Sequence, residues 1–222
     1  MKELKELKEV TQNYFSNYNV PDVINQESVI MFILESPHTQ EMKNGYPVAG
    51  SSGVEMTKNI YGKQFKEPFG KLVSQKEEYQ EQYQNLNKFS ILNVAPAPMQ
   101  KGGLQEYDLS AGDERVVAIL EKLRTNYKSK SHQKEGWNQV KKIVVANFKE
   151  RLVEALNELP DNQYLVPCGK LAESYLDLVK DDLELIQKQQ IIEGVPHPSF
   201  NQWSYDDAIA DLIEKIKTFN IE

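Results

Sequence analysis

The six residues Val29–Leu34 (VIMFIL) are all apolar, and this run constrains the fold more than any other stretch of the sequence. A strand with one face in water alternates apolar and polar residues, whereas an unbroken apolar run is typical of a strand covered on both faces in a parallel sheet. Shorter apolar runs follow at Phe89–Val94, Tyr164–Val166 and Gln190–Val195. We therefore expect a central four-stranded parallel sheet.

Helical patterns separate and flank the expected strands. Glu114–Tyr127, the stretch from Trp137 onward and Tyr205–Phe219 each place apolar residues on one face of a helix. These apolar positions are Val116, Val117, Leu120, Leu123 and Tyr127, then Val140, Val144, Phe148, Leu152 and Leu156, then Ile209, Leu212, Ile213 and Ile216. Strands that alternate with helices predict an α/β fold, here a three-layer α/β/α sandwich. The opening MKELKELKEV predicts an extra amphipathic helix over about residues 1–18.

Length and composition narrow the class of protein. A chain of 222 residues, 40% of them apolar, suits a single domain over residues 1–222. Its one cysteine, Cys168, rules out an internal disulfide and any four-cysteine zinc or iron–sulfur site, and we expect it to be a small buried packing residue. The sequence has neither the apolar core of a signal peptide nor a run long enough for a transmembrane helix. We therefore expect a cytoplasmic monomer that binds no membrane, no metal and no other cofactor.

The charge pattern leaves two segments open. The net charge of −7 argues against general coating of nucleic acid, but it leaves room for one local basic groove. Leu123–Val145 carries six Lys or Arg against the single acid Glu135, and it is either a solvated loop or a phosphate-contacting patch. We expect His132, within it, to be a surface residue without a partner. Lys63–Lys88 is rich in Gln, Glu and Lys, which predicts a surface helix or a mobile loop.

Polar residues follow three of the expected strands. Glu35-Ser36-Pro37-His38 comes after the first, Asn93 closes the second before VAPAP, and PHPS at 196–199 follows the fourth. In a parallel α/β sheet, ligands bind beyond the carboxyl ends of the strands. We therefore expect a carboxylate, a carboxamide and two imidazoles on one rim.

The order of these residues resembles that of the uracil-DNA glycosylase superfamily. Glu35–Gly53 is most similar to the first motif of its iron–sulfur, thermophile-type enzymes, in which Gly-Glu-Ala-Pro-Gly precedes Glu, Gly, Pro-Phe-Val-Gly and a final Gly. The matching positions are Glu35, Pro37, Glu41, Gly45, Pro47, Gly50 and Gly53. ILNVAPAP resembles the family's asparagine-bearing strand, VPCGKLA its Gly-Lys-x-Ala turn and VPHPS its His-Pro-Ser motif. The resemblance spans about Val29–Trp203 and implies that fold.

The resemblance also implies an activity, the hydrolysis of the N-glycosidic bond of uracil or a related deaminated base in DNA. It places the catalytic histidine at His197 and the uracil-reading asparagine at Asn93, with Glu35 as the second catalytic residue. The carboxamide of Asn93 offers a donor and an acceptor to the O4 and N3–H edge of uracil, and the edge of cytosine has the opposite polarity. His197 would stabilise charge on the departing base, an effect worth ~3–4 kcal/mol. Glu35 would position or activate the attacking water, or stabilise an oxocarbenium-like sugar.

Further residues complete the DNA site that the resemblance implies. His38, Tyr46 and Val48 are the candidates for contacts with the extruded base. Backbone amides near the start of the Ser-Ser-Gly stretch would hold the flanking phosphates, and an aromatic wedge would fill the vacated stack. The phosphate- and DNA-binding candidates are Gly50, Ser51, Ser52, Gly53, Ser199 and the two wedge residues Phe200 and Trp203.

The sequence also departs from the family pattern. Val48 stands where the iron–sulfur enzymes have a stacking Phe, Ser36 stands where the most active branch has a catalytic Asp, and the cluster cysteines are missing. These departures leave three hypotheses open. The first is a cofactor-free glycosylase acting on uracil-containing or damaged DNA. The second is a non-catalytic or altered member that binds a nucleobase or nucleic acid. The third is an unrelated small-molecule enzyme or interaction domain.

Overall fold

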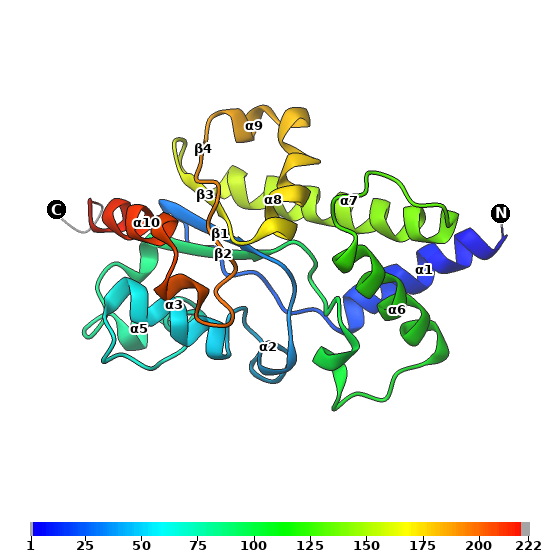
Figure 1. Cartoon of the computed structure of the whole chain (residues 1–222), viewed down its shortest axis with the longest axis horizontal. Coiled ribbons are helices and arrows are strands. Elements are labelled where there is room, and N and C mark those ends of the chain that lie inside the picture. The colour runs from blue at the N-terminus through cyan, green and yellow to red at the C-terminus, as the bar shows by residue number, and fades with distance from the viewer. Residues whose placement is uncertain (1, 219–222) are drawn as a thin grey trace.

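A four-stranded parallel sheet forms the centre of the molecule. The computed structural model describes residues 2–218 and contains β1 (Ile30–Leu34), β2 (Phe89–Asn93), β3 (Tyr164–Pro167) and β4 (Gln190–Ile191), in the order β2-β1-β3-β4 (Figure 1). The expected parallel sheet is confirmed. β4 is shorter than the predicted Gln190–Val195, because the chain is exposed at Glu193 and Gly194 and Gly194 has a positive φ of 83°.

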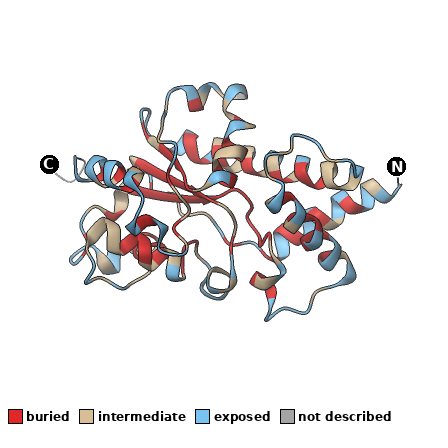
Figure 2. Ribbon diagram, viewed as in Figure 1, coloured by how far each residue is buried: buried red, intermediate tan, exposed pale blue. Residues whose placement is uncertain are grey.

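The central strand β1 is buried on both faces, which explains its continuous apolar sequence. Met31 and Ile33 belong to one hydrophobic cluster, and Ile30, Phe32 and Leu34 belong to another. Successive side chains of a strand point to opposite faces, so the two clusters lie on the two sides of the sheet. Figure 2 shows the buried strands between helices whose outer surfaces are exposed.

Helices from the N-terminus and from residues 111–187 cover one face of the sheet. They are α1 (Lys2–Asn17), α6 (Ala111–Thr125), α7 (Glu135–Glu158), α8 (Lys170–Asp177) and α9 (Glu184–Gln187). The predicted N-terminal helix is confirmed, and it packs against α6 and α7. The predicted apolar faces of α6 and α7 are buried, except that Tyr127 lies beyond the end of α6 and is only partly buried.

The other face is covered by α3 (Ser51–Tyr61), α4 (Phe69–Ser74) and α10 (Asp207–Thr218). Ile209, Leu212 and Ile216 of α10 are buried as predicted, and Ile213 is only partly buried. Phe219 lies outside the described residues. Helices on both faces make the chain an α/β protein with the layers that a three-layer arrangement requires. The remaining short elements are α2 (Thr39–Asn44), α5 (Lys76–Tyr79), η1 (Leu86–Lys88), η2 (Lys101–Leu104), η3 (Lys180–Asp182) and η4 (Gln202–Ser204).

The segment Lys63–Lys88 forms several short elements, and only α5, which has no buried residue, fits the prediction of a surface helix. The segment contains α4, α5 and η1, and its apolar side chains belong to the core. The buried ones are Phe69, Leu72, Val73, Tyr83 and Leu86. The many Gln, Glu and Lys residues between them concealed these anchors.

Two predictions on single residues have opposite outcomes. Cys168 is buried, with 1% of its surface exposed, as expected of a packing residue. His132 is half-buried with its ring edge against Trp137 at 5.7 Å between centroids, so the prediction of a partnerless surface residue is wrong. Asn138 also bonds both the N–H and the carbonyl of His132.

None of the helices described between residues 2 and 218 has the length and apolar character needed to cross a membrane.

Candidate functional site

The carboxyl ends of the strands open into a cavity of about 410 Å³. Leu34 of β1 is in register with Asn93 of β2, so the segments that follow these strands start side by side. The wall of the cavity comes from the ends of β1 and β2, the loop after β1, the start of α3, the end of α6 and the loop after β4. Its lining residues are Leu34, Glu35, Ser36, His38, Gln40, Glu41, Val48, Gly50, Ser51, Ser52, Asn93, Gln100, Arg124, His197, Ser199 and Phe200.

Asn93 lines this cavity with a carboxamide that is nearly sealed from solvent. The residue is 1% exposed, and its Nδ2 finds no hydrogen-bond partner among the described residues. Leaving such a buried donor unpaired costs about 1–3 kcal/mol. A ligand that presents an acceptor to Nδ2 would recover that energy.

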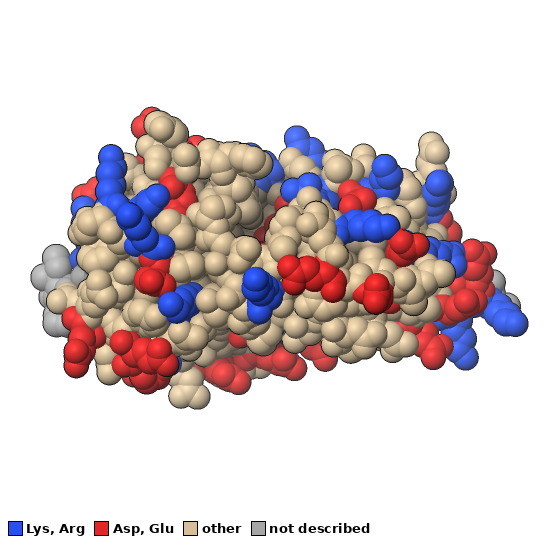
Figure 3. Space-filling view, turned by 90° about the horizontal axis from the view of Figure 1, so that it is seen from below, with Lys and Arg blue, Asp and Glu red and all other residues tan. Residues whose placement is uncertain are grey.

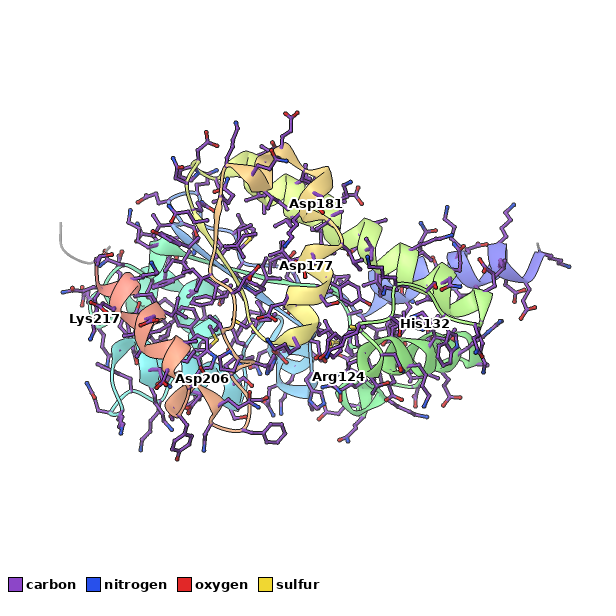
Figure 4. The ribbon with its side chains drawn as sticks, turned by 45° about the horizontal axis from the view of Figure 1, so that its top comes forward. Arg124, His132, Asp177, Asp181, Asp206 and Lys217 are labelled. Atoms are coloured by element: carbon purple, nitrogen blue, oxygen red, sulfur yellow. The ribbon has the colours of Figure 1, made fainter. Side chains whose placement is uncertain are left out.

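Glu35 forms an ion pair at the wall of the cavity. Its carboxylate forms an ion pair with Nε of Arg124, and the side chains are 16% and 37% exposed, respectively. Figure 4 shows Arg124 at the end of α6, reaching toward the middle of the molecule. In the sequence Arg124 is one of the six basic residues of Leu123–Val145, and its partner lies 89 residues away. No local pattern in the sequence could have paired them.

His197 is fixed in place by its neighbours and is a weak base. Its Nδ1 lies 3.0 Å from Oγ of Ser199. Burial lowers the pKa of His197 below its usual 6.5, Glu35 opposes that change and Arg124 adds to it. The imidazole is therefore neutral at pH 7. A hydroxyl can donate to an unprotonated nitrogen, so this contact suits the tautomer that carries its proton on Nε2.

Gly169 allows the segment that carries His197 to pass close to the end of β3. Gly169 has a positive φ of 90°, and its N–H donates to the carbonyl of Val195 over 2.8 Å. A Cβ at this position would lie 3.0 Å from Cβ of His197, a tight contact that would require the imidazole segment to shift. The glycine in VPCGKLA therefore has a packing role beside the imidazole.

Glu41 closes the loop after β1 on itself. Its carboxylate accepts the N–H of His38 over 2.7 Å and the N–H of Val48 over 3.0 Å. Burial raises the pKa of Glu41 to about 7, although those two hydrogen bonds favour the charged form. The resemblance matches Glu41 to the first motif and implies no role for it. Its place in the cavity wall adds a second carboxyl group to the lining that contains Glu35.

Val48 stands in the cavity wall in an unusual backbone conformation. Its φ of 47° is rare for a β-branched residue, and it indicates a loop held by its surroundings. One such constraint is Gly53, where a Cβ would lie only 1.8 Å from the carbonyl oxygen of Val48. Gly53 is therefore buried against this loop and does not line the cavity, so a phosphate contact through its backbone N–H stays a prediction.

The first residues of α3 do reach the cavity. Gly50 is the N-cap of this helix, and Ser51 and Ser52 form its first turn at the cavity wall. The first N–H groups of a helix have no partner within the helix. These amides and the two serine hydroxyls can thus bind an anion at the edge of the cavity.

The two wedge candidates lie in opposite environments. Phe200 lines the cavity and is 93% exposed, with a positive φ of 56°. Trp203 is 1% exposed, and its indole N–H donates to the carbonyl of Pro196 over 2.8 Å. Trp203 is a core residue, so its prediction as a wedge is wrong, whereas Phe200 is free to make contacts outside the protein.

The remaining base-binding candidates separate in the same way. His38 and Ser36 line the cavity, where Nδ1 of His38 lies 3.3 Å from Oγ1 of Thr39 and Oγ of Ser36 accepts the N–H of Met99. Tyr46 does not line the cavity, because its ring lies beside Gly70 of α4. Tyr46 therefore offers no aromatic face to the cavity beside Val48.

Charge around the site is mixed. Figure 3 shows the molecule from below the view of Figure 1, the side on which α2 and α3 lie. Among the described residues on this face, basic and acidic side chains are interspersed and most of the middle is uncharged. Within the part of the chain that the structure describes, no three His, Cys, Asp or Glu side chains cluster as metal ligands.

The basic segment after α6 is only partly available to a ligand. Lys141 is buried and bonds the carbonyl of Ser129, while Nζ of Lys134 lies 5.2 Å from the ring centre of Trp137. Arg124 is also paired, with Glu35. These contacts indicate that the segment is an ordered link between α6 and α7. A phosphate-contacting role for its remaining basic residues stays a prediction.

The chain matches no protein-family model, and no curated protein is similar enough in sequence to count as a relative.

Proposed function

We propose that this protein is a DNA glycosylase of the uracil-DNA glycosylase type, which hydrolyses the N-glycosidic bond of uracil or a related deaminated base. The observation that carries the proposal is the unpaired, buried carboxamide of Asn93 in a cavity that Glu35 and His197 also line. The motif order of the sequence and the parallel sheet order β2-β1-β3-β4 support the corresponding α/β/α fold. A volume of about 410 Å³ falls in the range of small-molecule pockets.

Asn93 selects the base. Its Nδ2 donates to O4 of uracil, which satisfies the orphan donor, and its Oδ1 accepts N3–H. Cytosine offers an amino group and an unprotonated N3 at the same places, so both contacts become donor against donor or acceptor against acceptor. A site built to pair with one edge rejects the other strongly, because its buried polar groups are then left unpaired.

His197 stabilises the leaving group. As the glycosidic bond breaks, its electron pair moves onto the base and negative charge gathers on O2. The neutral imidazole, whose Nδ1 accepts the hydroxyl of Ser199, donates Nε2–H to that oxygen. The base leaves as a hydrogen-bonded anion, which takes up a proton later.

Glu35 acts on the sugar side. Its carboxylate either positions and activates the water that attacks the anomeric carbon or stabilises the positive charge that develops on the sugar. Arg124 orients the carboxylate through their ion pair. In either role the water supplies the new C–O bond and loses one proton.

The DNA is held by local contacts because the surrounding surface has mixed charge. The first turn of α3, with Ser51 and Ser52, binds a phosphate next to the extruded nucleotide. Phe200, exposed at the edge of the cavity, fills the space that the base leaves in the stack. The protein works without a metal or a redox cofactor.

A second candidate function is binding without efficient cleavage, and one observation favours it. Val48 offers no aromatic face in the cavity, and stacking on such a face is worth about 1–3 kcal/mol per base. The ion pair with Arg124 also leaves the carboxylate of Glu35 less available to bind a water molecule. A protein of this kind would hold a nucleobase or single strand but would leave the glycosidic bond intact.

Incubation with a uracil-containing single strand decides between the two. The glycosylase releases the base and leaves alkali-labile sites, and Asn93→Ala or His197→Ala lowers the rate at least about 100-fold. Asn87→Ala, on the surface far from the cavity lining, is the matched control and keeps the wild-type rate. Salt-sensitive binding without base release from uracil, hypoxanthine or xanthine strands would refute the glycosylase and leave the binder.

A further inference from the structure

Behind Asn93, on the side away from β1, lies an ion pair that the proposed chemistry does not use. β2 is an edge strand of the sheet: one side of β2 pairs with β1, and no strand of the described sheet pairs with its other side. The segment before β1 runs along the free side, where Val23 and Ile91 form an antiparallel bridge. Asp22 precedes this bridge, and Arg151 reaches it from α7.

The pair bonds the peptide groups on both sides of the Asn93 Cα. Oδ1 of Asp22 accepts the N–H of Asn93 over 3.0 Å. One Nη of Arg151 donates to Oδ2 of Asp22 over 2.6 Å, and the other donates to the carbonyls of Asn93 and Val94 over 2.8 and 2.9 Å. The two side chains are 17% (Arg151) and 11% (Asp22) exposed. Asn147 accepts Nε–H of the same guanidinium over 2.9 Å.

We infer that Asp22 and Arg151 are positioning residues for base recognition, an inference that rests on the proposed function. They fix both peptide planes that flank Asn93, and hence the direction of its Cα–Cβ bond into the cavity. Without them the end of an edge strand would exchange its free backbone groups with water and shift by tenths of an ångström. Hydrogen-bond readout of one base edge depends on tolerances of about that size.

A merely structural ion pair makes a different prediction. Joining α7 to β2 would change stability and leave the discrimination between bases untouched. A positioning pair changes the rate and the preference for uracil in the folded enzyme. The fork of the guanidinium matters in the second case, because lysine keeps the charge but cannot bond Asp22 and two carbonyls in one plane.

The test compares Arg151→Lys with Arg115→Lys, whose ion pair with Glu3 is exposed and distant from the cavity lining. Both are assayed with uracil- and cytosine-containing strands well below their midpoints of thermal unfolding. We expect Arg151→Lys to lower kcat about tenfold or more, with KM changed less than threefold, and to reduce the preference for uracil. Arg115→Lys keeps wild-type values. Asp22→Asn, which retains an acceptor for the N–H of Asn93, loses less than Asp22→Ala.

A second readout separates this inference from the proposed function. The side-chain amide resonances of Asn93, followed in ¹⁵N-labelled protein, report its orientation without any substrate. We expect one sharp pair in the wild type and in Arg115→Lys, and shifted or multiple signals in Arg151→Lys. Unchanged signals in Arg151→Lys, or an unchanged rate and preference in that folded variant, overturn the inference. A wild type that releases no base overturns the proposed function, and the resonances still decide on the positioning pair.

Discussion

Two arginine–carboxylate pairs lie at the ends of the central strands, and they differ in what surrounds them. Arg124 and Glu35 face the cavity, with the arginine 37% and the glutamate 16% exposed, so the two pairs differ in exposure mainly at the arginine. Arg151 and Asp22 lie on the far side of Asn93, at 17% and 11% exposure, and bond the backbone as well as each other. The first pair lines the cavity of the proposed site, whereas the hydrogen bonds described for the second pair all go to other groups of the protein.

The comparison shows how one residue type can serve the site in two ways. Partly exposed ion pairs contribute little to stability because water screens them and can replace either partner. A desolvated pair contributes little net energy as a unit, but it becomes costly when only one partner is removed. We therefore expect mutation of the inner pair, Arg151 and Asp22, to cost much stability and mutation of the outer pair, Arg124 and Glu35, to cost little.

Removal of Asp22 has the largest expected effect on stability. Asp22→Ala leaves the guanidinium of Arg151 desolvated without its counterion and the N–H of Asn93 without its acceptor. Such a change costs about 3–5 kcal/mol. Urea unfolding measures it against Glu3→Ala, which breaks the exposed pair with Arg115 and costs less than about 1 kcal/mol.

The double variant Asp22→Leu, Arg151→Met sharpens the result. It removes both charges together, so we expect it to be more stable than Asp22→Ala although it has lost more hydrogen bonds. Equal losses of unfolding free energy in Asp22→Ala and Glu3→Ala would show that the inner pair behaves like a surface pair.

Glu41 is a third carboxyl group near the site, and it binds backbone N–H groups without any cation. Its pKa is about 7 in the folded chain against an ordinary 4.5. Its contribution to stability is therefore fully present below pH 4.5 and is lost as the pH rises through 7. Between pH 4.5 and 8 we expect the wild type to lose about 2–3 kcal/mol relative to Glu41→Gln, which has no titrating group there. Parallel urea midpoints for the two proteins across this range would contradict the assignment.

The fold was predictable where sequence periodicity reflects burial. The run Val29–Leu34 identified the central strand because both of its faces are covered, and the spacing of apolar residues identified α6 and α7. The prediction for Lys63–Lys88 failed outside α5 because its few core residues, such as Phe69 and Tyr83, are separated by many polar residues. Periodicity averages over a window, so isolated anchors between short helices escape it.

The site was predictable for residues that follow the strands or fall in the matched motifs, among them Ser51, Ser52 and Phe200, which also line the cavity. Parallel topology alone brings the segments after β1 and β2 together, and Glu35, Asn93 and His197 do line one cavity. Their roles stay predictions. Arg124 and Arg151 were missed because each meets a carboxylate far away in the sequence, 89 and 129 residues distant. The prediction of Trp203 as a wedge was wrong because its position next to a motif in the sequence does not tell which way the side chain faces.

The cavity pair should give the smallest change in stability and yet be visible at the site. We expect Arg124→Gln to change the free energy of unfolding by no more than about 1 kcal/mol, because the pair is partly exposed. The positive charge of Arg124 lowers the pKa of His197 and the carboxylate of Glu35 raises it. Removing the arginine therefore raises the pKa of His197, so its imidazole becomes protonated at higher pH than in the wild type.

The titration of the Cε1–H signal of His197 by NMR measures this change, with Arg115→Gln as the control that leaves the midpoint in place. His132 serves as an internal standard, because burial and Lys141 are the causes that lower its pKa. A rise at His197 alone shows that the outer pair adjusts the chemistry of the cavity while adding little to its support. Equal midpoints in Arg124→Gln and wild type would mean that solvent screens the arginine from the imidazole, and Arg124 would then be a surface residue that only orients Glu35.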